Sequence, residues 1–221
     1  MKLTETIEEE YANVKEIEIE TYKETYKNSS IHKDLLTAYE KWSKEYVFKE
    51  TSLIDYEVFV VQSGIEAIKE IEYDKSDITN FLFMLEKFQD REKFFRTGYF
   101  ISAMIDHHQR KREKKYKEYE KKDQKEHKKT PDTEDYLIIT ENFKKELLGL
   151  GAFNKKNLQI IGNGGAYLGI CMQSGTIRVR GSLNHHVGHK MTGGRIEIEG
   201  DMSFIGERCN GEIYLNGRKV N

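Results

Sequence analysis

Apolar residues recur at helical spacing through the first half of the chain. The clearest stripe advances in steps of four, three and four residues and consists of Leu35, Tyr39, Trp42 and Tyr46. Asp77 is suited to cap the N-terminus of another amphipathic helix. The apolar run at residues 56–61 fits either a buried helix or a strand, and we favour a helix because this half has no proline and no Gly-rich turn pair. We therefore predict a helical domain over residues 1–109 with an aromatic core.

A charged segment and a short connection follow the helical half. Residues 110–135 are expected to form a basic helix or linker, and Pro131 closes its basic stretch. Thr140 is suited to cap a short apolar helix, and Gly149 is suited to end it. The sequence therefore predicts a connecting helix over residues 136–156.

From residue 157 onward the pattern changes to strands in which apolar and polar residues alternate. Each strand ends in a glycine, and these glycines, spaced 19, 19 and 17 residues apart, are Gly162, Gly181, Gly200 and Gly217. A chain that returns to an equivalent position at such regular intervals must coil and stack each strand on the previous one. We therefore predict a short β-solenoid over residues 157–221.

The alignment of the repeats also predicts which side chains fill the coil. Ile177, Ile196 and Ile213 should stack in a single column. A second interior position, three residues after a repeated glycine, is occupied by Met172, Met191 and Cys209. We expect Cys209 to be an inert core thiol because it stacks on two methionines. The last coil should expose an unpaired strand edge after Val220, and we expect the helical domain or a second copy of the chain to cover it.

The repeat resembles a known family. The residues that carry the resemblance are 162–169 (GNGGAYLG) with Met172, and 193–201 (GGRIEIEGD). They are similar to the GXGXG repeat domain, which forms the C-terminal part of the glutamate synthase large subunit. The same domain makes up much of one subunit of formylmethanofuran dehydrogenase, a molybdenum or tungsten enzyme of methanogens. The resemblance covers roughly residues 155–221 and implies a right-handed, single-stranded β-helix. In both enzymes this domain holds other domains or subunits in place and carries no catalytic residues of its own.

The predicted fold class is α+β, with a helical N-terminal domain followed by a short right-handed, single-stranded β-helix. Charged residues make up 33% of the chain and hydrophobic residues 37%, with a net charge of −2. The dominance of Lys, Glu, Ile and Tyr is typical of thermophilic or archaeal proteins, and also of AT-rich genomes. The chain has no run of about 18 apolar residues, and its N-terminus is acidic, so we expect no membrane span, no secretion signal and a cytoplasmic location. Two cysteines are too few for a disulfide framework.

A histidine-rich turn is the first candidate for chemistry. His185, His186 and His189 are candidate metal ligands, to which neighbouring coils can add Cys171 or Glu207. The repeat alignment puts the first two histidines at turn positions that vary from coil to coil. This favours a solvated turn with one packed ring over a metal or anion contact, and also over general acid–base catalysis.

Positive charge is concentrated in residues 110–129, which hold eleven Lys or Arg and five Asp or Glu, whereas residues 1–20 hold seven Glu and two Lys. The candidate partner-binding residues of the basic segment are Arg110, Lys111, Arg112, Lys114, Lys115, Lys121 and Lys122. A helix of this kind can bind the phosphates of RNA or DNA without reading sequence. The interspersed acidic residues favour a solvated helix or linker, and contact with an acidic protein surface, including the chain's own N-terminus, is a further alternative.

The sequence offers no constellation of nucleophile, base and pocket, and residues 162–166 lack the Lys-Ser or Lys-Thr of a phosphate-binding loop. We therefore predict a non-catalytic scaffold or adaptor, without a cofactor, that docks a protein partner or a second copy of the chain. The outward side chains that suit flat docking are Arg178, Arg180, Arg195, Glu197 and Glu199. The alternatives are nucleic-acid binding through residues 110–129 and an accessory subunit of a redox complex like the two enzymes named above.

Overall fold

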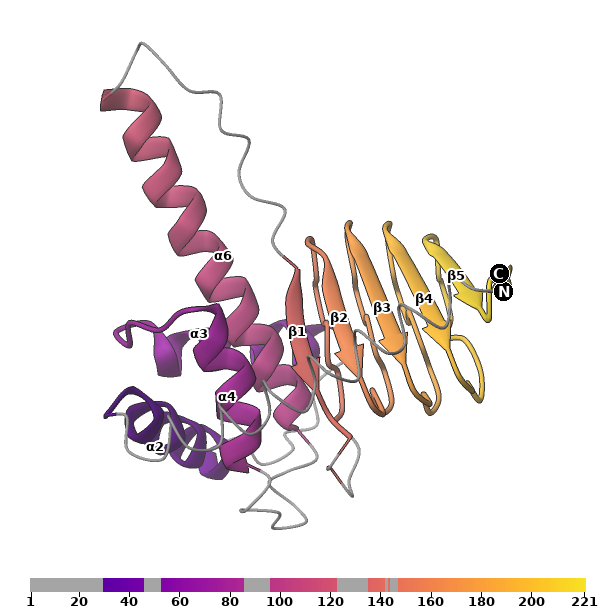
Figure 1. Ribbon diagram of the computed structural model, residues 1–221, viewed down its shortest axis with the longest axis horizontal. Coiled ribbons are helices and arrows are strands. Elements are labelled where there is room, and N and C mark those ends of the chain that lie inside the picture. The colour runs from indigo at the N-terminus through magenta and orange to yellow at the C-terminus, as the bar shows by residue number, and fades with distance from the viewer. Residues whose placement is uncertain (1–29, 46–52, 86–95, 123–134, 142, 144–146) are drawn as a thin grey trace, which may run out of the picture.

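The computed structural model describes residues 30–45, 53–85, 96–122, 135–141, 143 and 147–221. Its helices are α2 (Ser30–Glu45), α3 (Leu53–Ile68), α4 (Lys75–Leu85) and α6 (Thr97–Lys122). Its strands are β1 (Tyr136–Ile139), β2 (Leu158–Ile161), β3 (Thr176–Arg180), β4 (Arg195–Glu199), β5 (Glu212–Leu215) and β6 (Arg218–Lys219). Figure 1 shows the helices gathered at one end of a row of stacked strands. The protein is therefore α+β, with helices followed by a β-solenoid, as the sequence predicts.

Aromatic side chains form the core of the helical part. The buried members of the predicted stripe are Leu35, Tyr39 and Trp42. Trp42 Nε1 donates a hydrogen bond of 2.9 Å to Ser63 Oγ on α3, and the Tyr39 ring meets Phe100 edge-on with 5.2 Å between centroids. Tyr46 lies outside the described residues. The apolar run at residues 56–61 falls within α3, so its interpretation as a helix is confirmed.

Helix α4 begins before the predicted cap. Asp74 Oδ1 accepts hydrogen bonds from the backbone N–H groups of Ser76 at 2.7 Å and Asp77 at 3.1 Å. Asp77 Oδ2 in turn accepts the backbone N–H of Asp74 at 2.9 Å. This reciprocal arrangement is a capping box in which Asp74, not Asp77, is the N-cap. The prediction was wrong because both positions hold aspartate and only the backbone decides which one caps.

Helix α6 crosses the predicted domain boundary between residues 109 and 110 without a break. Its first half packs in the core through residues such as Phe100 and Met104, both fully buried. Its second half is charged and extends away from the other elements (Figure 1). The change in composition therefore marks the point at which the helix leaves the core. The expected linker at residues 123–134 lies outside the described residues.

The predicted connecting helix over residues 136–156 is wrong. Strand β1 pairs in parallel with β2, with Tyr136 opposite Leu158, and no described residue between these strands is helical. Residues 142 and 144–146 of the predicted helix lie outside the described part of the chain, and its described residues after Thr140 form turns and irregular structure. This stretch is an additional first coil. Paired positions on the first and second coils are 22 residues apart in the sequence, whereas those on the next coils are 19 apart. The first coil therefore does not fit the repeat spacing by which the others are recognised.

The predicted isoleucine column is present in the solenoid. Ile177 pairs with Ile196, and Ile196 pairs with Ile213; all three are fully buried. The register extends this column through Leu158 to Tyr136 on the first coil. A second inward-facing column consists of Ile138, Ile160, Val179, Ile198 and Leu215. These columns connect with the helical core, so the helices and the solenoid share one apolar interior.

The sulfur-containing side chains also occupy the interior position that the repeat predicts. Met172 and Met191 are fully buried. Cys209 Sγ lies 3.9 Å from Met191 Sδ, and burial raises the pKa of this thiol. At neutral pH Cys209 is therefore a protonated packing residue, as predicted.

Three of the four predicted corner glycines occupy equivalent corners. Gly162, Gly181 and Gly200 have φ angles of 108°, 150° and 148°. A Cβ added to Gly181 would overlap the carbonyl oxygen of Gly162 on the preceding coil, and the same relation holds between Gly200 and Gly181. Gly217 differs, because it forms a hairpin turn with Asn216 between β5 and β6, with φ angles of 77° and 49°. Two positive φ angles in succession are typical of a type I′ turn.

The chain itself covers both ends of the sheet. On the β1 side, Thr79 Oγ1 of α4 donates to the carbonyl oxygen of Leu137 at 2.7 Å. On the other side, β6 pairs antiparallel with β5. Asn221 Oδ1 accepts the backbone N–H of Ile213, and its Nδ2 donates to the carbonyl oxygen of Gly211, both at 2.7 Å. The predicted open edge after Val220 is therefore wrong, since residues 218–221 cover β5.

Replacing a corner glycine should destabilise the solenoid far more than replacing the hairpin glycine. We expect Gly181→Ala to lower the free energy of unfolding by roughly 2–4 kcal/mol, because the new Cβ combines a strained φ with backbone overlap. Gly217→Ala is the matched control, since its φ is also positive but its Cβ would have no neighbour within 4 Å. We expect it to cost only about 1 kcal/mol. Urea denaturation of both variants measures the difference, and equal losses would contradict the stacked-corner explanation.

Candidate docking surface

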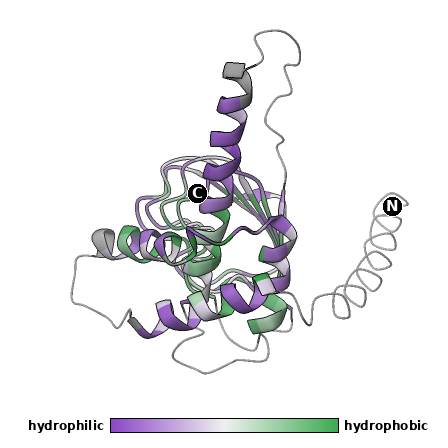
Figure 2. Cartoon of the chain, turned by 90° about the vertical axis from the view of Figure 1, so that its left-hand side faces the viewer, coloured by the Kyte–Doolittle hydropathy of each residue, from purple (hydrophilic) through white to green (hydrophobic). Residues whose placement is uncertain are grey.

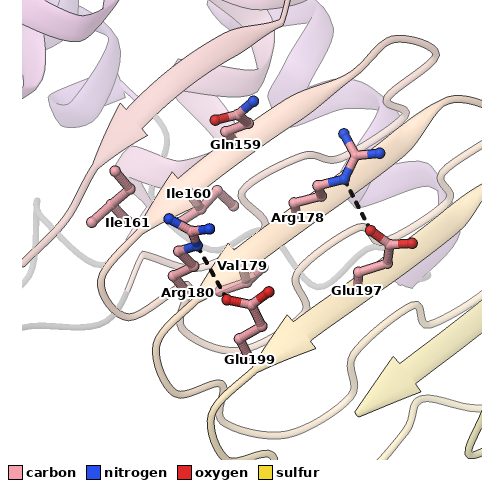
Figure 3. Close-up of a pocket in the computed structure, with 8 residues that line it drawn as sticks. All are labelled: Gln159, Ile160, Ile161, Arg178, Val179, Arg180, Glu197 and Glu199. Carbon is pink, nitrogen blue, oxygen red and sulfur yellow. Dashed lines mark hydrogen bonds and ion pairs between the residues drawn. The ribbon is translucent and has the colours of Figure 1, made fainter. Parts of the chain in front are cut away.

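The outer face of the sheet carries two adjacent rows of opposite charge. Strand alternation turns Arg178 and Arg180 outward on β3, and Glu197 and Glu199 outward on β4. The register places each arginine directly beside a glutamate. Arg178 Nε donates to Glu197 Oε2 at 2.9 Å, and Arg180 Nε donates to Glu199 Oε2 at 3.1 Å (Figure 3). The sequence-predicted docking residues of these two strands are therefore brought together as ordered ion pairs.

Side chains on the neighbouring strands extend this face. Arg195 Nε lies 2.7 Å from Glu197 Oε1, and its guanidinium group lies 3.9 Å from the ring centroid of Tyr214 on β5. On β2, Gln159 Nε2 donates to Asp135 Oδ2 at 2.9 Å. A shallow hollow of about 250 Å³ lies across β2, β3 and β4, and Gln159 and the two charged rows line it. We call the outer face of β2 to β5 the charged face.

The exposure of these ion pairs limits their contribution to folding. The side chains of Arg178 and Arg180 are 50% and 48% exposed. A pair of this kind contributes only about 0–1 kcal/mol to stability. Figure 3 shows the terminal nitrogens of Arg178 directed away from Glu197, so these groups are placed to donate hydrogen bonds outward. A shallow surface with outward donors suits contact with another protein better than it suits catalysis, which needs an enclosed pocket.

The candidate metal-ligating histidines form an aromatic cluster at a corner of the solenoid. The ring centroids of His185 and His186 lie 5.0 Å apart, and those of His186 and His189 lie 5.8 Å apart. Tyr167 stacks on His186 with 4.6 Å between centroids. His189 is the buried ring of the three. Its pKa is lowered, chiefly by burial and also by the positive charge of the neighbouring Lys190. In the described part of the chain, no group of three or more His, Cys, Asp or Glu is arranged to hold a metal ion, so the metal hypothesis gains no support.

A buried carboxylate joins the helices to the solenoid, and the sequence analysis missed it. Glu57 on α3 is only 2% exposed. Its Oε2 atom lies 3.7 Å from Lys190 Nζ and 3.6 Å from Cys171 Sγ. Cys171 and Lys190 occupy equivalent corners of consecutive coils, with φ angles of 55° and 54°. No local pattern links Glu57 to Cys171, because 114 residues separate them.

The ionisation of this buried group follows from its surroundings. Burial raises the pKa of Glu57, and the positive charge of Lys190 acts against that shift. Burial and the neighbouring Glu57 carboxylate raise the pKa of Cys171 to about 11. Cys171 is therefore a protonated thiol at neutral pH and a weak nucleophile. The arrangement fits a structural contact between α3 and two coils.

The predicted basic residues lie on the outer half of α6. Two of them pair with the helical part, since Arg110 Nη2 lies 2.6 Å from Asp106 Oδ2 and Lys111 Nζ lies 2.8 Å from Glu72 Oε1. The exposed basic residues that follow are Arg112, Lys114 and Lys115. Lys121 and Lys122 fall at the end of the helix. Figure 2 shows α6 hydrophilic where it stands clear of the other elements, and residues 123–129 lie outside the described part of the chain.

Comparisons with known proteins add no assignment. No protein-family model, no curated protein and no solved structure matches the chain. Within the described residues, no helix combines the length and apolar character needed to cross a membrane. Function is therefore inferred from the fold and from the surfaces of the protein.

Removing Lys190 should make stability depend on the charge of Glu57. We expect Lys190→Met to lower the free energy of unfolding by roughly 1–3 kcal/mol at neutral pH, because it leaves a buried carboxylate without its cation. The folded-state pKa of Glu57 is raised, so the penalty is present when Glu57 is ionised. It should disappear as the pH falls through that pKa and Glu57 binds a proton. Urea denaturation of the variant and the wild type across the acidic range measures this convergence.

The double variant Glu57→Gln/Lys190→Met is the control for that measurement. Because a neutral amide replaces the carboxylate, we expect it to recover most of the stability lost in Lys190→Met at neutral pH. A Lys190→Met loss that is the same at acidic and neutral pH, with no recovery in the double variant, would show that the ion pair is not the cause.

Proposed function

We propose that the protein is a non-catalytic scaffold or adaptor that docks a protein partner on the charged face of the solenoid. The observation that carries the proposal is the pair of in-register rows, Arg178 with Arg180 and Glu197 with Glu199, held half-exposed on stacked coils. Rows of opposite charge favour a partner with complementary charges and disfavour others. The function assigned to the face is therefore selective contact.

The rigidity of the scaffold supports this proposal. Backbone hydrogen bonds join each coil to the next, both in the strands and in the turns, as between Gly188 N and Leu168 O at 2.8 Å. A surface that is already ordered loses little conformational entropy on binding. The helices pack at the β1 end and at the corners that hold Cys171 and Lys190, and the charged side chains of β3 and β4 remain partly or fully exposed. Stability and access to the face are thus provided by different parts of the chain.

The resemblance of the repeat to the GXGXG domain points in the same direction. That domain holds other domains or subunits together in glutamate synthase and in formylmethanofuran dehydrogenase. By this analogy the alternative to a second copy of the chain is a subunit of a multisubunit enzyme, and a redox complex is the class that the resemblance suggests. In that alternative the protein contributes position and rigidity, and the partner carries the chemistry.

Site-specific photocrosslinking in the native cell tests the docking proposal. A photoreactive p-benzoylphenylalanine at position 159 would lie in the hollow of the charged face. We expect it to give one defined crosslinked product, which the added substitutions Arg178→Glu and Arg180→Glu should remove by reversing the charge of one row.

The matched control places the same residue at position 203, where the exposed Ser203 lies on another side of the coil, away from the strands. Docking on the charged face predicts no such product from position 203. The same product from both positions, or none from position 159, would contradict the proposal.

Nucleic-acid binding by the outer half of α6 is a second candidate. One observation favours it: the exposed Lys114 and Lys115 stand on a rigid helix that extends clear of the body (Figure 1). An extended basic helix can neutralise phosphates in succession. The Arg110 and Lys111 ion pairs weaken this candidate, because they already engage part of the positive charge.

A titration of fluorescently labelled single-stranded RNA tests this candidate. We expect Lys114→Glu/Lys115→Glu to weaken binding at least about tenfold at low salt, because two phosphate contacts are lost and two repulsions are added. Lys41→Glu/Lys44→Glu on α2 reverses two other exposed lysines and should leave the affinity unchanged. No binding at low salt, or equal losses in both variants, would remove nucleic acid from consideration.

A further inference from the structure

We propose that the charged face binds a second copy of this chain, sheet to sheet, about a two-fold axis parallel to the strands between β3 and β4. The inference rests on the docking function proposed above and names its partner. It follows from the arrangement of charge on the face, since a surface that pairs with itself must be self-complementary.

The two charged rows meet that condition in one orientation. Rotation about an axis parallel to the strands exchanges the two sides of the face and keeps the height of each residue along the strand. The arginine row of one copy then faces the glutamate row of the other. Arg178 lies level with Glu197, and Arg180 lies level with Glu199, so each arginine meets the glutamate at its own height.

The other two-fold axis in the plane of the face does not work. An axis perpendicular to the strands leaves each row facing the same row of the second copy. With this axis at the height of Arg178 and Glu197, each of these two residues would oppose its own equivalent, which is unfavourable at close distance, and only Arg195 would meet a glutamate. The charge pattern therefore favours the axis parallel to the strands over the perpendicular one.

The groups needed for contacts between copies are in place. Within one copy, Arg178 and Arg180 donate to their glutamates through Nε. Figure 3 shows the terminal nitrogens of the Arg178 guanidinium group directed away from Glu197. A guanidinium group has five N–H donors and can bind a carboxylate through two parallel hydrogen bonds. Arg178 can therefore keep its internal pair and bind a glutamate of the second copy.

The flanks of the face are also compatible with this axis. The rotation places β2 of one copy over β5 of the other. Gln159 and Tyr214 lie level with each other in the register, so the amide of one copy faces the phenol ring of the other. Arg195 already lies against that ring and fixes its position. The other outward residues of the two flanks are Ile161 on β2 and Glu212 on β5, and neither faces a like charge after the rotation.

The size of the face sets the strength that we expect. Four strands of four or five residues cover roughly 300 Å² at ordinary strand spacing. A stable protein interface buries about 800 Å² on each partner. We therefore expect a weak, salt-sensitive dimer, with a dissociation constant on the order of 100 µM at low salt.

Charge reversal in separate copies tests the inference directly. Arg178→Glu/Arg180→Glu makes both rows acidic, and Glu197→Arg/Glu199→Arg makes both rows basic. We expect each double variant to be monomeric alone in sedimentation equilibrium, because its rows repel the rows of an identical copy. An equimolar mixture of the two should form a heterodimer at least about ten times tighter than the wild-type dimer, since diagonal neighbours across the interface, which repel in the wild type, then attract as well as the directly opposed pairs.

Circular dichroism melting shows whether each variant folds. If one does not, Arg178→Gln/Arg180→Gln in the full chain replaces it, and the inference then requires a weaker dimer and a smaller salt dependence than in the wild type. A monomeric wild type at low salt and high concentration, together with a mixture that does not associate, would overturn the inference. A different protein crosslinked from position 159 under those circumstances would leave the docking function standing and refute only its assignment to a second copy.

Discussion

The stacking of one coil on the next is the interaction on which the rest of this structure depends. In a parallel solenoid the backbone N–H and C=O groups of each strand bond to the neighbouring coils, so no coil is satisfied alone. The first and last coils therefore need partners of another kind. Ser102 Oγ on α6 accepts the N–H of Ala152 at 3.2 Å, and its single proton is shared between the carbonyl oxygens of Gly98 at 2.8 Å and Gly149 at 3.0 Å. Asn221 fills the equivalent role on β5. The helices are thus the cover for one end of the solenoid, and the hairpin is the cover for the other.

The same stacking imposes a strained corner on successive coils. The residues with a side chain that adopt positive φ at this corner are Phe153, Cys171, Lys190 and Arg208. A residue with a Cβ costs about 1–2 kcal/mol in this conformation. Lys190 has a compensating contact, because the corner directs its side chain to the buried Glu57 on α3. The backbone strain at Lys190 is thus offset by a contact that links α3 to the solenoid.

The sequence predicted the features that local periodicity encodes and missed those that depend on packing between distant segments. Alternation and corner glycines identified β2 to β5 and placed the outward arginines and glutamates on one face, and the constant spacing of 19 residues brings them into register.

The first coil was mistaken for a helix because its apolar spacing resembles a helical turn and its length differs from the repeat. The hairpin was overlooked, although Asn216-Gly217 is a strong turn signal, because the repeat alignment had already assigned the glycine. The contact between Glu57 and Lys190 has no regularity to detect, since it depends on how α3 packs against the solenoid. A single glutamate in an apolar helix, such as Glu57, can indicate at most that its carboxylate is buried. It does not identify Lys190 as the cation that pairs with it.

The charge pattern of the outer face is itself a consequence of parallel stacking. Equivalent outward residues of successive coils lie about 4.8 Å apart, so like charges at the same height destabilise the stack. The chain avoids this by placing arginines on β3, glutamates on β4 and the uncharged Tyr214 on β5. Alternation between coils removes repulsion inside one molecule and at the same time produces two parallel rows of opposite sign. A surface with two such rows complements its own image after a half-turn about the strand direction. Parallel stacking thus also produces the charge pattern on which the proposed docking depends.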